Sequence, residues 1–337
     1  MNSLVRFQPP APRLCYNLAM TTPRPTFRNP LMLDGADPFL ITHGGWYYFS
    51  ATAGTAISLR RARRLDELKD APDEVVWRDD APGRFRDMWA QEFFQLDGLN
   101  GRRWYLYYTA SDGEDSHHRM FVCESEGDDP RGPYTFKAKL QTDPDDAHYA
   151  IDGSVLLLPD GRLFFLWCGR PSSTGQGLYL SRMSDPCTLS GPRVPLPADG
   201  FGCDEVREGP VTLQRNGRVF LTYSACDTGK PDYKLGMLIA DTDADLLDPA
   251  SWRQHPAPVF TRNDEGGVYG PGHNNFFKSP DGAEDWIVYH AKTDSGYTYR
   301  GRSARAQPFG WGADGLPDFG RPLPLDADVP APSGEAG

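Results

Sequence analysis

The feature that most constrains the fold is a pattern that occurs five times along the chain. In each copy a strongly apolar segment is followed by small or polar residues; the copies are WYYFSAT (46–52), WYLYYTAS (104–111), LFFLWCG (163–169), VFLTYSA (219–225) and WIVYHAK (286–292). Their starts are separated by 56 to 67 residues. A glycine-containing turn precedes each segment, and another strand-like run precedes each turn. This arrangement is the sequence signature of a β-hairpin.

A third strand-like segment follows in every copy, for example AISLRRA (56–62) and GLYLSRM (177–183). Units of roughly 55–65 residues with three or four antiparallel strands are typical of propeller blades. A β-sandwich does not require five-fold recurrence of one pattern. We therefore predict an all-β, single-domain, five-bladed β-propeller over residues 27–323, with an N-terminal tail over 1–26 (Met20 being an alternative start) and a C-terminal tail over 324–337, whose last residues, VPAPSGEAG (329–337), we expect to be disordered.

Composition excludes several classes of function. The chain has 35 Lys and Arg against 46 Asp and Glu, which gives a net charge of −11. This balance argues against nucleic acid as a partner, because a sequence-independent binder needs a basic face to neutralise phosphates. There is no polybasic segment for an anionic membrane, and no apolar run approaches the ~20 residues that span a bilayer. The composition predicts a soluble protein with a large core, taken by default as a monomer.

The cysteines and the N-terminus bear on the compartment. The six cysteines include no CxxC pair, and several lie in apolar strand-like runs, so we predict buried, unpaired thiols at positions 15, 123, 168, 187, 203 and 226. The first 19 residues lack a continuous apolar region and are interrupted by Pro9, Pro10 and Pro12, unlike an export signal. On these grounds we expect a cytoplasmic protein.

Polar residues recur where the innermost strand of each blade begins. The five residues at this level are Asp37, Glu92, Asp152, Glu208 and His273. They are interpretable as solvated strand-end acids, as a metal site or as catalytic groups. Like charges held close together raise the pKa of at least one member. A separation into one ionised base and one protonated acid is what glycoside hydrolysis requires.

The motifs around these residues carry a family resemblance. In chain order they are GADPF, WAQE, AIDGS, EGP and GPGHN. Together they resemble glycoside hydrolase family 43, and within it the α-L-arabinofuranosidases, over roughly residues 27–323. The resemblance implies a five-bladed propeller, inversion of configuration and three catalytic carboxylates. It also implies an exo-acting enzyme that releases terminal α-L-arabinofuranosyl residues from arabinan or arabinoxylan oligosaccharides.

The resemblance assigns a role to each carboxylate. Asp37 matches the general base that activates water, and Glu208 matches the general acid that protonates the departing glycosidic oxygen. Asp152 matches the carboxylate that raises the pKa of Glu208 and orients it. In an inverting enzyme the acid and the base stand about 6.5–9.5 Å apart, which admits a water molecule.

Substrate-binding residues follow from the same resemblance. Glu92 and Trp89 match residues that contact the terminal sugar, although Gln91 stands where the family commonly has proline, and Trp89 is open to a core role. Arg302 matches an arginine that hydrogen-bonds sugar hydroxyls. Its alternative is a surface ion pair, and Arg300 and Arg305 are rivals in the same segment.

Two interpretations of His273 stay open. In resembling enzymes the histidine of the GHN motif helps to hold a structural calcium ion in the channel, whereas a lone histidine among glycines is otherwise a hydrogen-bonded loop residue. No cofactor is expected to be required for catalysis.

Other functions remain to be weighed against the arabinofuranosidase. A β-D-xylosidase is the nearest rival, because xylopyranose and arabinofuranose present related hydroxyls, and an endo-arabinanase is less favoured. From another class, a non-catalytic carbohydrate-binding propeller has the same fold. Retention of all three acids argues against a mere binder. The linkage that is cut is left open.

Overall fold

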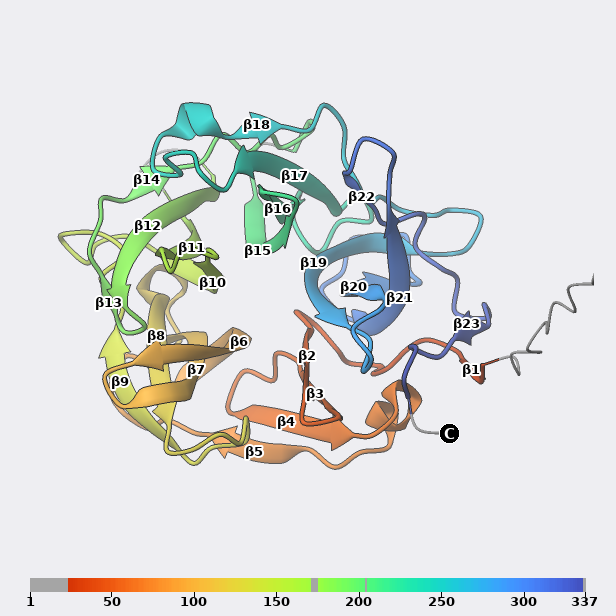
Figure 1. Cartoon of the computed structure of the whole chain (residues 1–337), viewed down its shortest axis with the longest axis horizontal. Helices are drawn as coiled ribbons and strands as arrows, with labels where there is room; N and C mark the ends of the chain where they lie inside the picture. Colours follow the sequence, from red (N-terminus) through yellow and green to blue (C-terminus); the bar gives the residue numbers. More distant parts are fainter. Residues whose placement is uncertain (1–23, 171–174, 204, 336–337) are drawn as a thin grey trace, which may run out of the picture.

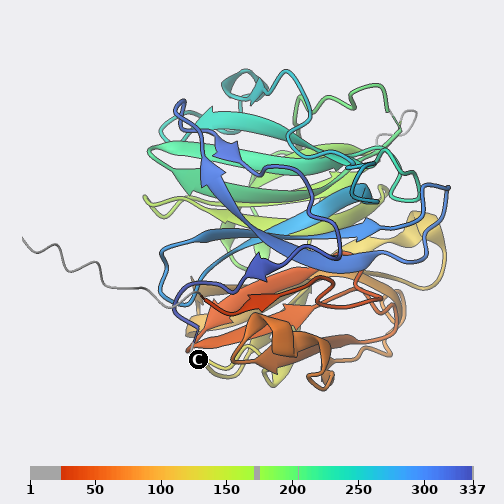
Figure 2. The same ribbon diagram turned by 90° about the vertical axis from the view of Figure 1, so that its right-hand side faces the viewer.

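The protein is a five-bladed β-propeller, as the sequence predicts. The computed structural model describes residues 24–170, 175–203 and 205–335. Five antiparallel sheets surround a central axis, and each is followed along the chain by its neighbour in the ring (Figure 1). Viewed from the side, many of the strands run across the view, and connecting loops lie at both of their ends (Figure 2).

Each blade begins with its innermost strand and proceeds outward. Blade 1 consists of β2 (Phe39–His43), β3 (Trp46–Ser50), β4 (Ile57–Ala62) and β5 (Glu74–Trp77). Blade 2 consists of β6 (Arg86–Gly98), β7 (Gly101–Ser111), β8 (Arg119–Ser125) and β9 (Tyr134–Lys139). Blade 3 consists of β10 (Ala150–Leu157), β11 (Leu163–Gly169), β12 (Gly177–Asp185), β13 (Thr188–Leu189) and β14 (Val194–Pro195).

The last two blades have four strands each. Blade 4 consists of β15 (Arg207–Arg215), β16 (Arg218–Ala225), β17 (Lys234–Asp241) and β18 (Arg253–Gln254). Blade 5 consists of β19 (Tyr269–Lys278), β20 (Asp285–Lys292), β21 (Ser303–Trp311) and β22 (Pro317–Asp318). Helical structure in the described residues is limited to three short 3₁₀ turns, η1 (Leu65–Lys69), η2 (Asp115–His117) and η3 (Pro249–Ser251).

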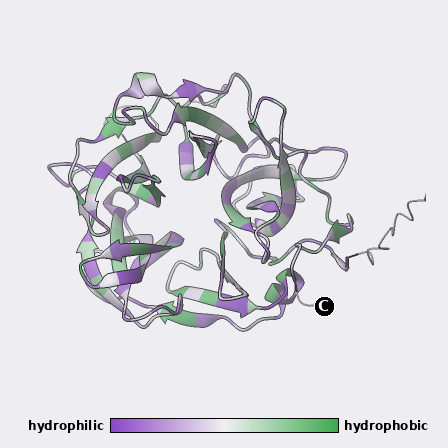
Figure 3. Ribbon diagram, in the orientation of Figure 1, coloured by the Kyte–Doolittle hydropathy of each residue, from purple (hydrophilic) through white to green (hydrophobic). Residues whose placement is uncertain are grey.

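The core lies between the blades. A hydrophobic cluster fills each of the five interfaces between neighbouring sheets. The second strand of a blade packs on both sides, which explains why these strands are the continuous apolar runs that repeat in the sequence. Hydrophobic and hydrophilic residues alternate along many other strands (Figure 3). Trp104 and Trp286 are buried, whereas Trp46 is half-buried beneath the guanidinium groups of Arg61 and Arg63.

The first and last strands that the structure describes pair with each other. β1 (Thr26–Phe27) pairs antiparallel with β23 (Val329–Pro330), which lies beside it in Figure 1. The sequence predicts a disordered end over residues 329–337, and this is wrong for residues 329–335, which the structure describes. Val329 is 1% exposed, and the carboxylate of Glu335 accepts a hydrogen bond from the backbone N–H of Leu65. A two-residue strand with a single buried valine is too short to be recognised in the sequence of a proline-rich segment.

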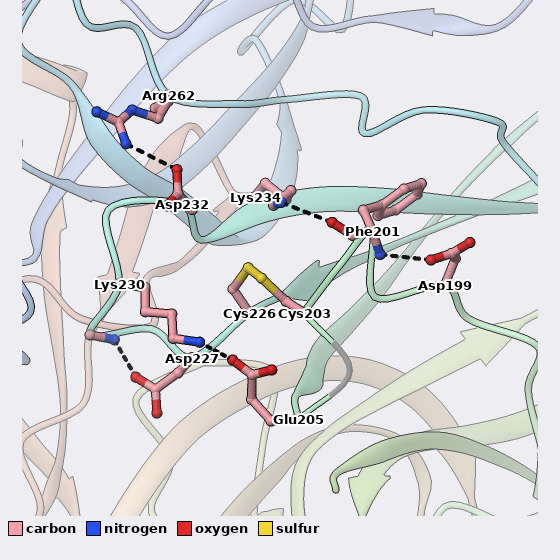
Figure 4. The surroundings of a disulfide bond; sticks show 11 residues. Asp199, Phe201, Cys203, Glu205, Cys226, Asp227, Lys230, Asp232, Lys234 and Arg262 are labelled. Carbon is pink, nitrogen blue, oxygen red and sulfur yellow. Dashed lines mark hydrogen bonds and ion pairs between the residues drawn. A yellow bond between two sulfur atoms is a disulfide. The ribbon is translucent and has the colours of Figure 1, made fainter.

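The cysteine prediction holds only in part. Cys203 and Cys226 form a disulfide bond, with 4.8 Å between their Cα atoms (Figure 4). They lie in two loops that only the fold brings together, so their spacing gives no warning of the bond. Cys123 and Cys168 are free and buried, and Cys187 is free and half-buried. Cys15 lies outside the described residues, as does the predicted N-terminal tail up to residue 23.

None of the helices in the described part of the chain has the length and apolar character needed to cross a membrane.

Candidate active site

A bend with left-handed backbone marks the same level in every blade. The residues in this conformation are Asp37 (φ 52°), Ala90 (φ 45°), Asp152 (φ 56°), Gly209 (φ 56°) and His273 (φ 45°). In blades 2 to 5 the bend coincides with an irregular register between the first two strands, as in a β-bulge. Bulges re-aim side chains near active sites, and left-handed non-glycine residues cost about 1–3 kcal/mol each. The strain is therefore concentrated at one mouth of the channel.

This geometry corrects the alignment of two predicted residues. The sequence places Glu92 and Glu208 at the level of Asp37 and Asp152. In the structure that level is held by Ala90 and Gly209, so Glu208 precedes the bend by one residue and Glu92 follows it by two. Sequence spacing did not reveal the offset because a bulge adds a residue to one strand without altering the apolar pattern around it.

Polar side chains from the preceding blade stabilise the bends. The backbone N–H groups of four of these residues donate to side chains of the preceding blade, which lie in its second strand or two residues after it: Ala90 to Thr52 Oγ1 (2.9 Å), Asp152 to Thr109 Oγ1 (3.1 Å), His273 to Ser224 Oγ (2.7 Å) and Asp37 to His290 Nδ1 (3.1 Å). These bonds offset part of the strain and connect successive blades around the ring.

In the fifth of these contacts, between blades 3 and 4, a carboxylate accepts the backbone N–H in place of a hydroxyl or an imidazole. Cys168 stands opposite Ile151 in blade 3, where the other blades carry a hydroxyl or an imidazole. Sulfur is a weak acceptor, and the N–H of Gly209 donates to Asp152 Oδ2 at 3.1 Å. Asp152 is thereby held against the strand that carries Glu208.

The bends surround a pocket of about 450 Å³ at the mouth. Its walls contain the three predicted carboxylates together with Trp89, Arg302 and His273. The remaining lining residues are Thr52, Asp115, Tyr149, Ile151, Arg170, Gln176, Val206, Asp227, Thr228 and Tyr299. Glu92 does not line this pocket as the described residues form it. Burial raises the pKa of Glu92 to about 8, although Ser154 acts in the opposite direction.

Asp37 is held as an ionised carboxylate. Its Oδ2 accepts the hydroxyl of Thr52 at 2.8 Å, and its Oδ1 lies 3.2 Å from Arg302 Nη1. Because the Thr52 oxygen already accepts the Ala90 N–H, its single proton is directed at Asp37. Burial opposes ionisation, but His273, Arg302 and the Thr52 hydroxyl outweigh it and hold the pKa of Asp37 well below its usual range.

His290 fixes the backbone of Asp37 through a hydrogen bond. Its Nδ1 accepts the Asp37 N–H, so the proton of the neutral ring is on Nε2, which donates to Thr228 Oγ1 at 3.1 Å. Burial lowers the pKa of His290 well below its ordinary value, and Arg302 acts in the same direction. The ring also stacks on Tyr233, with 5.5 Å between centroids and 5° between planes. Sequence reasoning did not single out Thr52, His290 or Tyr233: Thr52 and His290 belong to the repeated apolar segments, which indicate core, and Tyr233 lies in a polar connection before β17.

Glu208 and Asp152 form a buried acidic pair. Tyr233 donates its hydroxyl to Glu208 Oε1 at 2.7 Å. Burial raises the pKa of Glu208 to about 7, and the charge of Asp37 adds to the shift. Burial and the charge of Glu208 raise the pKa of Asp152 well above its usual value. The two carboxyls titrate as a unit and retain a proton near neutral pH, in contrast to Asp37.

One wall of the pocket is aromatic. Trp89 stacks on His118 with 4.1 Å between ring centroids, and Tyr149 packs edge-on against the other side of that imidazole. Arg170 lies over Tyr149 and pairs with Asp115 at 2.6 Å. Trp89 therefore faces the pocket instead of the core.

The comparison with protein families covers the part of the chain that forms the propeller. A model of Glycosyl hydrolases family 43 matches residues 27–317, which is most of the chain and includes all five blades. The chain belongs to glycosyl hydrolase family 43.

Relatives of this family 43 chain carry the names of arabinofuranosidases. It is 36% identical to Alpha-L-arabinofuranosidase 43 of Humicola insolens, over 93% of this chain and 66% of the relative. It is 37% identical to an extracellular exo-alpha-(1->5)-L-arabinofuranosidase of Streptomyces avermitilis, over 90% of this chain and 65% of the relative. The chain thus spans about two thirds of the length of these two relatives. The crystal structure of an alpha-L-arabinofuranosidase from Lactobacillus brevis superposes with a TM-score of 0.81 at 34% identity, covering 89% of this chain and 98% of that one.

The comparison also corrects the predicted compartment. The relative from Streptomyces avermitilis and another from Streptomyces chartreusis, 37% identical over 82% of this chain and 85% of the relative, are both named extracellular. The expectation of a cytoplasmic protein is therefore wrong. The Cys203–Cys226 disulfide agrees with the correction, because such bonds persist in oxidising compartments.

The three arginines of the last blade have different surroundings in this family 43 chain. Arg302 contacts Asp37 and faces the pocket. Arg305 is fully buried and donates to Ser303 Oγ, and Arg300 is exposed. The structure thus favours Arg302 among the three as the residue placed to meet a substrate.

His273 has one acidic neighbour, Asp37, among the residues that the structure describes. Its Nδ1 lies 3.3 Å from Asp37 Oδ1, and burial lowers its pKa. Calcium takes six to eight oxygen ligands, and no group of three or more His, Cys, Asp or Glu side chains in the described ranges is arranged to hold an ion. The described His, Cys, Asp and Glu side chains therefore do not form a calcium site by themselves.

Proposed function

We propose that the protein is an exo-acting, inverting α-L-arabinofuranosidase that removes terminal arabinofuranosyl residues from arabinan or arabinoxylan chains outside the cytoplasm. The observation that carries the proposal is a pocket lined by three carboxyl groups in different surroundings. Asp37 contacts Thr52 and Arg302, which favour its ionised form, whereas burial raises the pKa of Glu208 to about 7. The names of the relatives support arabinofuranosides over xylosides as the substrate class.

The proposed reaction begins at Asp37. The carboxylate accepts a proton from a water molecule, and the water oxygen attacks the anomeric carbon of the terminal sugar. Hydrogen bonds from Thr52 and Arg302 fix the direction of the Asp37 oxygens, so that the carboxylate meets the water without reorganisation. Because the water attacks from the face opposite the leaving group, the configuration inverts.

Glu208 completes the reaction on the other side of the sugar. Its proton passes to the glycosidic oxygen as the bond to the anomeric carbon breaks, and the leaving chain departs as an alcohol. A pKa near 7 keeps Glu208 protonated in mildly acidic solution yet able to donate. Asp152, fixed by the N–H of Gly209, lies in the same buried site as Glu208, and because two negative charges there repel each other the pair keeps a proton before substrate binds.

The proposal is tested by comparing 4-nitrophenyl α-L-arabinofuranoside with 4-nitrophenyl β-D-xylopyranoside. We expect kcat/KM to be higher for the arabinofuranoside, and proton NMR to show the β-anomer of arabinose as the first product. Preference for the xylopyranoside would make the protein a β-D-xylosidase with the same catalytic groups. Binding of arabino-oligosaccharides without turnover of either substrate would make it a carbohydrate-binding propeller and contradict the assignment of acid and base.

A further inference from the structure

We infer that Tyr297 and Tyr299 form an aromatic platform that binds the sugar on the leaving-group side of the scissile bond. The inference rests on the proposed glycosidase function and adds a second sugar-binding position to it. Its ligand is the pentose unit of the arabinan or arabinoxylan chain that remains after the terminal residue is removed.

The two rings are exposed beside the pocket. Tyr297 is 61% exposed and Tyr299 is 51% exposed, and Tyr299 lines the pocket. Among the described aromatic residues, only Phe85 joins them in the group of exposed large apolar side chains, and it does not line the pocket. Aromatic rings combine a large apolar face with, in tyrosine, a polar edge. Such faces suit the C–H surface of a sugar at the mouth of its binding site.

Hydrogen bonds fix the orientation of both rings. The hydroxyls of Tyr297 and Tyr299 are 2.7 Å apart, and the Tyr299 hydroxyl donates to Asp227 Oδ2 at 2.9 Å. The ring planes meet at 72°, with 5.5 Å between centroids. Exposed side chains held in this way lose little conformational entropy when a ligand stacks on them.

A buried lysine joins the two loops beneath the platform. Lys292 Nζ donates to the backbone oxygens of Gly229 (2.5 Å) and Thr298 (3.1 Å), and the N–H of Thr298 also donates to Gly229. A Cβ atom at Gly229 would lie 3.0 Å from the ring of Tyr297, so glycine permits this close approach. The tyrosine loop of blade 5 and the Asp227 loop of blade 4 are therefore one packed unit.

The platform is tied to the side of the pocket that carries Glu208. Asp227, which anchors Tyr299, directly follows Cys226 of the disulfide. The next residues return to the segment before Glu208 through an ion pair between Lys230 and Glu205 (Figure 4). Because Glu208 donates its proton to the oxygen of the leaving chain, that chain leaves the pocket beside the acid. The first sugar of the chain then meets the tyrosines.

The test compares two substrates whose leaving groups are both alcohols. The α-1,5-linked arabinofuranosyl disaccharide carries a leaving sugar, and methyl α-L-arabinofuranoside does not. For Tyr299→Ala we expect kcat/KM on the disaccharide to fall about tenfold, chiefly through KM, the scale of one aromatic stacking contact. The methyl glycoside should change less than about twofold. Tyr299→Phe should retain most of the disaccharide activity, because it keeps the ring.

Control variants separate the platform from a structural effect. Tyr297→Ala should act on the disaccharide in the same direction as Tyr299→Ala, and Phe85→Ala, which removes an exposed ring outside the pocket, should change neither substrate. Equal losses on both substrates, or no loss on the disaccharide, would overturn the platform. A wild-type protein that hydrolyses neither glycoside would instead overturn the proposed function.

Discussion

Removing one hydroxyl should move the alkaline limit of activity upward. In Tyr233→Phe the ring remains stacked on His290, but Glu208 loses the hydrogen bond that its Oε1 accepts at 2.7 Å. That bond favours the ionised form of Glu208, so its loss raises the pKa above about 7. A hydrogen bond to a charged group contributes about 1.5–3 kcal/mol, and 1.36 kcal/mol corresponds to one pKa unit. The expected rise is therefore about 1–2 units.

The assay is the pH dependence of kcat/KM on an arabinofuranosyl disaccharide. Activity requires protonated Glu208, so its alkaline limb follows the pKa of the free enzyme's acid and should shift to higher pH in Tyr233→Phe. Tyr223→Phe is the matched control, since this buried tyrosine of the same blade donates to the backbone oxygen of Asp199. An unmoved limb in Tyr233→Phe, or a shift to lower pH, would refute the assignment of Glu208 as the acid.

Three further predictions concern the support of the site. Thr52→Val should lower kcat about tenfold with little change in KM, because the hydroxyl directs Asp37 and satisfies the Ala90 N–H. Thr52→Ser, which keeps the hydroxyl, should retain the wild-type kcat. Steady-state kinetics of both variants measure this, and a change in KM alone would contradict the role given to Thr52. Replacing Cys203 and Cys226 by alanine should lower the free energy of unfolding by about 3 kcal/mol, given the separation of 23 residues, as measured by urea denaturation; an unchanged midpoint would contradict this. Treatment with EDTA should leave kcat unchanged, because the proposed acid and base are carboxyl groups, and a loss restored by calcium would show that an ion supports the site.

The architecture was predictable because a propeller repeats its chemistry. The second strand of each blade packs between two neighbours, so it is apolar in every copy, and this recurrence is visible without any structure. Asp37, Asp152 and Glu208 were found for the same reason, since motifs recur at the start of each blade. The roles of these three residues remain predictions.

Other parts of the site depend on contacts that no local pattern records. Thr52 contacts Asp37 across a bend, and His290 reaches it from blade 5 only because the ring closes. The disulfide joins the loop before the β15–β16 hairpin to the loop after it. The offset of Glu92 from the pocket arises from a bulge, which leaves the hydrophobic pattern intact.

The most direct test of the central claim compares two leaving groups in two variants. For Asp37→Asn, kcat/KM should fall by about 10²–10⁴ on both 4-nitrophenyl α-L-arabinofuranoside and the arabinofuranosyl disaccharide, because the base acts on water in either case. For Glu208→Gln, the disaccharide should suffer a loss of that size, whereas the nitrophenyl glycoside, whose leaving group needs little protonation, should lose much less. Equal losses on both substrates in Glu208→Gln, or retained activity in Asp37→Asn, would contradict the account.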